Sequence, residues 1–94
     1  MFTWDTQKAI SNYEKHGVPF EEAATAFTDP NGFEIPDAKH SMQESRFKRL
    51  AVSTLGRVLH IVFPIRRMKN GKETIRIISA RQASRKEREI YTRQ

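Results

Sequence analysis

The sequence predicts an α+β fold: two N-terminal helices, an antiparallel sheet of about four strands and a C-terminal helix. Apolar residues recur at helical spacing near the N-terminus, whereas from residue 33 onward the pattern changes to short apolar stretches separated by turn residues. A capping-box pattern near the C-terminus then predicts a last helix. Two helices followed by a meander of strands predict a sheet covered by helices on one face and partly open on the other.

Each N-terminal helix has a start signal and a stop signal. Asp5 can cap a helix over residues 6–15, and Gly17 stands where a left-handed residue ends a helix. A second helix is predicted over residues 20–27 and ends at the turn formed by residues 29–32. Its apolar positions match the i, i+3, i+4, i+7 spacing of a buried helix face: Phe20, Ala23, Ala24 and Phe27.

The strands are bounded by proline, glycine and asparagine. Residues 33–35 alternate and stop at Pro36, which predicts a short edge strand. A polar loop over residues 37–44 follows. Residues 46–53 and 58–65 are predicted to pair as a hairpin, because the loop between them contains a glycine.

The C-terminal part contains a second hairpin signal. Asn70-Gly71 is a strong turn dipeptide and precedes a predicted strand over residues 74–79. Ser84 and Glu87 then form a capping box that opens a helix to about Thr92.

If Ser53 pairs with Arg57, the face of the sheet to which each side chain of the hairpin points can be predicted. One face then carries Phe47, Arg49, Ala51, Leu59, Ile61 and Phe63, and the other carries Arg46, Lys48, Leu50, Val52, Val58, His60 and Val62. A two-residue turn at Asn70-Gly71 adds Ser79 and Arg81 beside His60 and places Arg76 on the Phe63 face. A turn longer by one residue reverses the last strand. Pro64 favours a bulge or slippage near this hairpin, because proline cannot donate to the ladder.

Charge is strongly segregated along the 94 residues, a length that predicts a single small domain over residues 1–94. Residues 1–45 hold three lysines and eight acidic residues, a balance of −5, whereas residues 46–94 hold fourteen basic and three acidic residues, a balance of +11. A basic half of this kind favours a polyanionic partner, through neutralisation of phosphates and release of counterions.

Several function classes are not expected. The chain has no cysteine, which excludes disulfides and thiolate zinc sites. Its three histidines are 24 and 20 residues apart, so they show no metal-ligand spacing. No phosphate loop or nucleophile motif is present. With neither a signal peptide nor a membrane-spanning apolar run in the sequence, we expect a soluble intracellular protein.

RNA cleavage remains compatible with these residues, because the 2′-OH of the substrate can itself be the nucleophile. Such an enzyme needs a proton acceptor, a proton donor and cations that stabilise the charged phosphorane. Arginine suits the last role. The candidates are Arg46, Arg57, Arg76 and Arg81 as cations, and Glu44, His60 and Tyr91 as acid–base groups. Tyr91 could equally be a packing residue of the last helix, and Glu44 could simply pair with an arginine.

Motifs along nearly the whole chain, from residue 3 to residue 91, resemble the BrnT toxin family. Trp4-Asp5, Lys15-His16-Gly17-Val18 and Phe20-Glu21-Glu22-Ala23 are similar to the opening of that family. Glu44-Ser45-Arg46-Phe47 looks like its Glu/Arg/aromatic element. Residues 76–81, with Ala83, Glu87, Arg88 and Tyr91, look like its C-terminal signature. The basic segment 66–72 departs from the family by looking longer.

The resemblance implies a RelE-like fold and a metal-independent ribonuclease toxin of a type II toxin–antitoxin system, with no cofactor. It implies growth arrest, neutralisation by a BrnA-like ribbon-helix-helix antitoxin, operator DNA binding only through that antitoxin, and a cytoplasmic location. Matched by motif, the catalytic candidates are Glu44, Arg46, Arg57, Arg76 and Arg81. The expected RNA-binding residues are Lys48, Arg49, His60, Arg66 and Arg67, with Tyr91 as a further acid–base candidate.

Two other functions fit the same basic half. One is a non-catalytic module that binds nucleic acid or an antitoxin within a repressor complex. The other is a basic surface that binds an acidic protein. Salt-sensitive RNA binding without cleavage products would favour the first, and competition between an acidic protein and RNA would favour the second.

Overall fold

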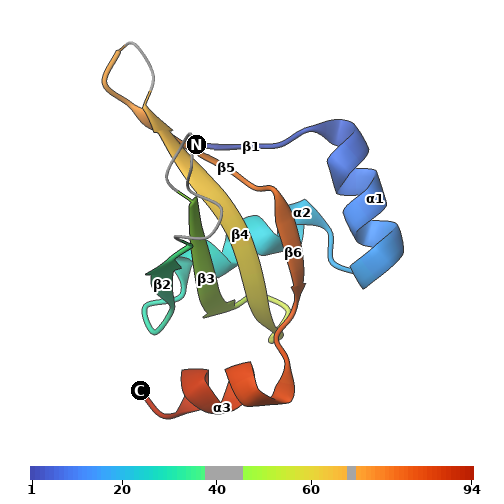
Figure 1. Cartoon of the computed structure of the whole chain (residues 1–94), viewed down its shortest axis with the longest axis vertical. Coiled ribbons are helices and arrows are strands. Elements are labelled where there is room, and N and C mark those ends of the chain that lie inside the picture. Colours follow the sequence, from blue (N-terminus) through green and yellow to red (C-terminus); the bar gives the residue numbers. More distant parts are fainter. Residues whose placement is uncertain (38–45, 68–69) are drawn as a thin grey trace.

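The computed structural model describes residues 1–37, 46–67 and 70–94, with the side chains of residues 66 and 67 left out (Figure 1). It has the predicted α+β fold, with two N-terminal helices, a mostly antiparallel sheet and a C-terminal helix. The elements are β1 (Phe2–Thr3), α1 (Thr6–His16), α2 (Phe20–Thr25), the 3-10 turn η1 (Ala26–Thr28), β2 (Phe33–Pro36), β3 (Arg46–Val52), β4 (Val58–Arg67), β5 (Glu73–Arg76), β6 (Ser79–Gln82) and α3 (Arg85–Thr92).

The expected cap residues form the ends of α1. The Asp5 side chain accepts a hydrogen bond from the Lys8 amide at 3.1 Å. Gly17 is left-handed, with a φ of 69°, and its N–H donates to the Tyr13 carbonyl at 2.8 Å. A residue with a Cβ would be strained in this conformation. Among the described residues, no helix is both long and apolar enough to cross a membrane.

The described strands form a six-stranded sheet in the order β1-β5-β4-β3-β2, with β6 also paired to β4. β2 lies at an edge, as predicted. Two differences from the expected four strands involve β5. The first is β1, which adds a short parallel strand beside β5. The second is that the strand predicted over residues 74–79 divides into β5 and β6.

A bulge causes this division. Ile65 pairs with Ile75, but Val62 pairs with Ser79, so the last strand contains one extra residue between these two pairs. The Ile77 N–H donates to the Thr3 carbonyl of β1 at 3.0 Å, and the Ile78 N–H donates to the Val62 carbonyl at 2.9 Å. The bulge lies next to the strand that contains Pro64, where a bulge or slippage was predicted.

The pairing register of β4 with β5 corrects the expected position of Arg76, whereas the bulge restores the expected pairing of β6. A two-residue turn would have placed Arg76 on the Phe63 face, but the paired residues Arg67 and Glu73 leave five residues between them. With Ile75 opposite Ile65, the adjacent Arg76 points to the other face. A shift of one residue is enough to exchange the faces of a strand.

The hydrophobic core lies between the sheet and the N-terminal helices. Figure 1 shows α2 crossing behind the sheet, α1 beside one edge and α3 beyond the lower end of the strands. Phe27 is central, with its ring centroid 5.0 Å from that of Phe2 and 4.9 Å from that of Phe63. The fully buried core side chains include Val18, Phe20, Leu59, Ile61, Phe63 and Ile77. This packing leaves the side chains of Lys48, His60 and Arg81 on the opposite face.

Candidate functional site

The face of the sheet away from α2 carries the side chains that the hairpin register predicted. Phe47 pairs with Phe63 on the core side, whereas Leu50 pairs with His60 on the other side. His60 also pairs with Arg81 of β6, as expected. We call this surface the open face. It contains Arg46, Lys48, Leu50, Val52, Val58, His60, Val62, Ser79 and Arg81, joined by Arg76.

A cluster of three ionisable side chains stands on the open face where β4 and β6 meet α3. The Arg81 guanidinium donates to both carboxylate oxygens of Glu87, at 2.8 and 3.1 Å. His60 Nε2 lies 3.8 Å from Glu87 Oε2. Glu87 also accepts the Ser84 amide at 2.8 Å in the capping box of α3. The first turn of α3 therefore orients Arg81 beside His60.

The cluster sets the protonation state of its members. Hydrogen bonds from Arg81 lower the pKa of Glu87 to about 2, so Glu87 is a carboxylate at neutral pH. Burial, followed by the positive charge of Arg81, lowers the pKa of His60 below its usual 6.5, although Glu87 opposes this shift. His60 is therefore mainly a neutral imidazole at pH 7, with 12% of its side chain exposed.

This arrangement brings together two of the functions that RNA cleavage needs. A neutral imidazole can accept a proton, and a guanidinium can stabilise negative charge on a phosphoryl group. Glu87 occupies one edge of the Arg81 guanidinium, while among the described residues no partner contacts its Nε–H. That edge can donate to a phosphate while Glu87 keeps the guanidinium in place.

Two further arginines belong to the upper part of the open face. Arg46 begins β3 and pairs with Pro64, and the register of β5 places Arg76 across the same part of β4. Both are partly buried. Lys48 lies between this part and the cluster, and its charge contributes to the low pKa of His60. The open face therefore brings together four of the expected cations.

Arg57 lies at the turn end of β4, apart from the cluster. Its guanidinium makes a two-point contact with the carboxylate of Glu22, with Nε donating at 2.9 Å and Nη2 donating to the other oxygen. Ser53 donates to the same carboxylate at 2.7 Å, and Arg57 Nη2 also reaches the Gly17 carbonyl at 3.2 Å. Only 3% of the Glu22 side chain is exposed. This geometry fits a clamp between the hairpin and the helical layer better than a catalytic role.

Arg49 points into the core side of the sheet and has 6% exposure. It donates to the Ala26 carbonyl at 3.2 Å, to the Asp29 carbonyl at 2.9 Å and to Glu34 at 2.6 Å. Its guanidinium also lies 5.3 Å from the centre of the Phe27 ring. These internal contacts occupy Arg49 within the fold, away from the surface at which RNA was expected to bind.

Tyr91 joins α3 to the turn after η1. Its hydroxyl donates to Asp29 Oδ2 at 2.5 Å, and this hydrogen bond raises the pKa of Tyr91 to about 12. The second oxygen of Asp29 accepts the Asn31 amide, and Oδ2 also accepts the Val52 amide. With its proton held by Asp29, Tyr91 is arranged as a docking residue for α3, as the packing interpretation expected.

Three expected site residues lie outside what the structure describes. Glu44 falls in the segment 38–45, and the side chains of Arg66 and Arg67 are among those left out. Among the described residues, no group of three or more His, Asp or Glu side chains is placed to hold a metal ion.

Sequence reasoning missed the carboxylates that hold the arginines. Glu87 was recognised only as a capping residue, although it lies six residues from Arg81 and binds it in two places. Glu22 is 35 residues from Arg57, and no local pattern joins them. A signal for the first pair was present, because a strand that leads directly into a capped helix brings the helix N-terminus close to the strand end.

Comparison with known proteins identifies a family and a similar fold. A family model described as the ribonuclease toxin, BrnT, of type II toxin–antitoxin systems matches residues 4–87. Among solved structures, the chain is similar to the crystal structure of the Brucella abortus ribonuclease toxin, BrnT, with a TM-score of 0.66 and 22% identity. That similarity covers 90% of this chain and 99% of the other. No curated protein matches the sequence.

Proposed function

Since the chain belongs to the BrnT family of ribonuclease toxins of type II toxin–antitoxin systems, we propose that it cleaves RNA on the open face without a metal ion. His60 and Arg81 are the central residues of this proposal. The observation that carries it is their pairing across β4 and β6, where a neutral imidazole and an oriented guanidinium stand together on an otherwise cationic surface.

The proposed reaction uses the substrate's own 2′-OH. His60 accepts the proton of this hydroxyl, and the 2′-oxygen attacks the adjacent phosphorus. The bond from phosphorus to the 5′-oxygen breaks, which leaves a 2′,3′-cyclic phosphate and a 5′-hydroxyl. Water or the newly protonated imidazole returns a proton to the leaving 5′-oxygen. No other reactant is required.

The cations stabilise the negative charge that develops on phosphorus. Arg81 donates from the edge that Glu87 leaves accessible, and Glu87 acts as a positioning residue. Lys48, Arg46 and Arg76 extend the positive surface along the strands, where they bind the neighbouring phosphates. Glu44, Arg66 and Arg67 remain candidates for the same surface.

The proposal includes the biological setting. Cleavage of cellular RNA in the cytoplasm arrests growth, and a BrnA-like ribbon-helix-helix antitoxin neutralises the toxin and carries the operator-binding function. Because the antitoxin must suppress RNA cleavage, we expect it to compete with RNA for the open face. An acidic surface or segment on the antitoxin suits this role.

Expression of the chain alone tests the proposal. We expect growth arrest and RNA fragments ending in 2′,3′-cyclic phosphate, and we expect Arg81→Lys, Arg76→Ala and His60→Gln to reduce both. Purified protein should cleave RNA in the presence of EDTA. Because burial keeps the pKa of His60 below its usual 6.5, the wild-type cleavage rate should stay constant down to pH 6.5 and fall only at lower pH.

Folding of each variant is checked by circular dichroism and thermal unfolding. Normal growth and intact RNA with folded, expressed wild-type protein would contradict the proposal. Salt-sensitive RNA binding by such an inactive protein would favour the non-catalytic module instead. Cleavage that EDTA abolishes and Mg²⁺ restores would contradict metal independence.

A further inference from the structure

A second cationic surface adjoins the open face at the edge of the sheet. A groove of about 390 Å³ runs between α1 and the segment that joins β5 to β6. Lys8, Lys15 and His16 line its helix side, and its strand side is formed by Ile78 and Ser79. No acidic residue lines it, although α1 belongs to the half of the chain that has a net charge of −5.

The groove is held rigidly by an asparagine at its base. The Asn12 amide donates to the Ala80 carbonyl at 2.8 Å and to the Val18 carbonyl at 3.1 Å. Asn12 Oδ1 in turn accepts the Ala80 amide at 3.1 Å. The two hydrogen bonds between Asn12 and Ala80 join α1 to the edge of β6. Asn12 is buried, with 7% of its surface exposed. The lysines beside it therefore project from a fixed support.

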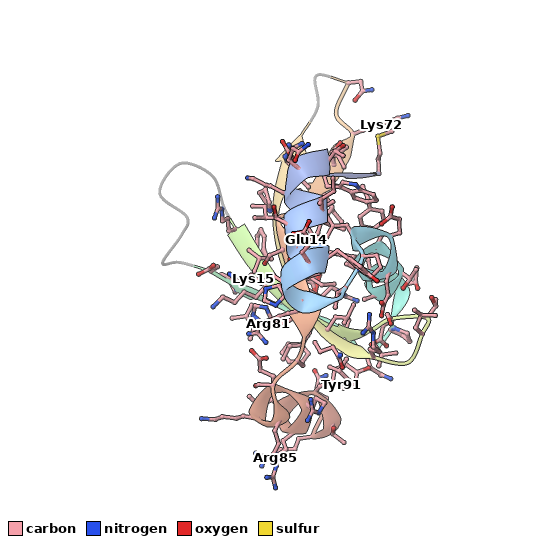
Figure 2. The ribbon with its side chains drawn as sticks, turned by 90° about the vertical axis from the view of Figure 1, so that its right-hand side faces the viewer. Glu14, Lys15, Lys72, Arg81, Arg85 and Tyr91 are labelled. Carbon is pink, nitrogen blue, oxygen red and sulfur yellow. The ribbon has the colours of Figure 1, made fainter. Side chains whose placement is uncertain are left out.

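The two sides of α1 differ in charge. The side that faces away from β6 borders an apolar groove that includes Ile10, Tyr13, Glu14 and Glu21. The lysines are confined to the β6 side. Figure 2 shows Lys15 and Arg81 extending toward the same side of the molecule, while Glu14 lies on the front of the helix. Placement of both lysines of α1 on one side of the helix, away from its single glutamate, provides a cationic path rather than a general surface charge.

The groove and the open face share a residue. Ser79 lines the groove and also pairs with Val62 on the open face. Arg81 follows two positions along the same strand, a distance of about 7 Å. Lys8 and Lys15 are separated by about 10 Å along the helix, which corresponds to roughly three phosphates of a stacked strand. A strand bound at Arg81 can therefore continue into the groove without a gap.

We propose that this groove binds the sugar–phosphate backbone of the RNA on one side of the cleaved bond, with Lys8 and Lys15 contacting phosphates about three nucleotides apart. The inference rests on the proposed cleavage at the open face and adds a subsite to it. It predicts that affinity depends on the length of the RNA, because a short oligonucleotide fills only the open face. RNA is favoured over an acidic protein because the groove contains two lysines and no acidic residue and is continuous with the proposed site.

The test compares two lengths of 2′-O-methyl RNA, which lacks the nucleophile and so remains uncleaved. Oligonucleotides of about three and about ten nucleotides distinguish the open face from the full path. We expect Lys8→Gln/Lys15→Gln to weaken binding of the longer RNA on the order of tenfold at 0.1 M salt and to reduce its salt slope by about 1.4. Binding of the shorter RNA should stay unchanged.

A matched control removes two charges elsewhere. Arg85 and Lys86 are exposed on α3, and Figure 2 shows Arg85 pointing away from the sheet. Arg85→Gln/Lys86→Gln should therefore change binding of both RNAs little. An equal effect of the two double variants on RNA affinity, or an equal loss of affinity for both RNA lengths, would overturn the proposal that the groove binds RNA. An unchanged affinity for RNA with a lost affinity for an acidic protein would also overturn it.

These outcomes are separate from those that test the proposed function. The binding measurements need no catalysis, and substitution of the lysines leaves His60 and Arg81 intact. Active enzyme with length-independent binding contradicts the groove alone. Folded wild-type protein that cleaves no RNA contradicts the proposed function, whatever the groove variants bind.

Discussion

Arginines that look alike in the sequence have different environments in the fold. Arg49 is buried and donates to backbone carbonyl groups, and Arg57 binds the buried carboxylate of Glu22. Arg81 binds the partly exposed carboxylate of Glu87, and its own side chain also faces solvent. The environment of each depends on an acidic or carbonyl partner from another element. Strand alternation predicted the faces of Arg49 and Arg81 correctly, but it contained no information about Glu22.

The Arg57–Glu22 pair leads to a stability prediction. Arg57→Gln leaves the Glu22 carboxylate buried without its cation, and we expect it to lower the free energy of unfolding by about 2–3 kcal/mol. The double variant Arg57→Gln/Glu22→Gln should recover part of this loss, because the uncompensated charge is removed. Urea unfolding at pH 7 measures both. Additive losses in the double variant would contradict the clamp.

The lowered pKa of Glu87 leads to a prediction of how the free energy of unfolding depends on pH. Its pKa is lowered from 4.5 to about 2 in the folded state, so its contribution is complete above pH 4.5 and is lost as the pH falls through 2. Glu87→Gln keeps the capping box but loses the ion pair, and should lower the free energy of unfolding at pH 7 by about 2 kcal/mol.

Urea unfolding at pH 7 and at pH 2.5 measures this effect. The difference between wild type and Glu87→Gln should shrink at the lower pH, because the wild-type carboxylate then loses much of its advantage. A difference that is the same at both values would show that Glu87 does not contribute through its charge.

At the scale of elements, local patterns predicted the helices and the central hairpin well, because their determinants lie within a few residues. Asp5, Gly17 and the Ser84–Glu87 capping box all occupy their expected positions. The last strand was less predictable. Its division into β5 and β6 depends on Ile77, whose N–H bonds to β1 at the other end of the chain. A two-residue strand such as β1 has no period to detect.

Docking of α3 depends on Tyr91. Tyr91→Phe removes the hydroxyl that donates to Asp29, and we expect a loss of about 1.5–2 kcal/mol in the free energy of unfolding. The raised folded-state pKa means that this contribution is present below pH 10 and is lost as the pH rises through about 12. Tyr13→Phe is the matched control, because Tyr13 is 56% exposed. Equal effects of the two substitutions, measured by thermal unfolding at pH 7, would show that the Asp29 contact adds nothing.

At the scale of the whole molecule, the fold converts a charge gradient along the chain into a charge difference across the sheet. The acidic half supplies the helical layer, while the basic half supplies the strands whose outward side chains form the open face. This separation could be predicted because the charge of each half and the alternation of side chains along a strand are both read from the sequence without knowledge of tertiary contacts. The sequence did not predict that Lys8 and Lys15, within the acidic half, would stand beside β6, because packing of α1 against the sheet edge decides their position.

RNA binding by the whole molecule should therefore be governed by salt. If the open face and the groove together contact four or five phosphates, the logarithm of the affinity for single-stranded RNA should fall with the logarithm of salt concentration with a slope of roughly −3. A DNA oligonucleotide of the same sequence should give a similar slope, because backbone phosphates dominate, yet it should remain intact because it lacks the 2′-OH. Fluorescence anisotropy at salt concentrations from about 0.05 M to about 0.3 M measures both slopes. A slope near zero for RNA would mean that base stacking, and not the cationic surface, holds the strand.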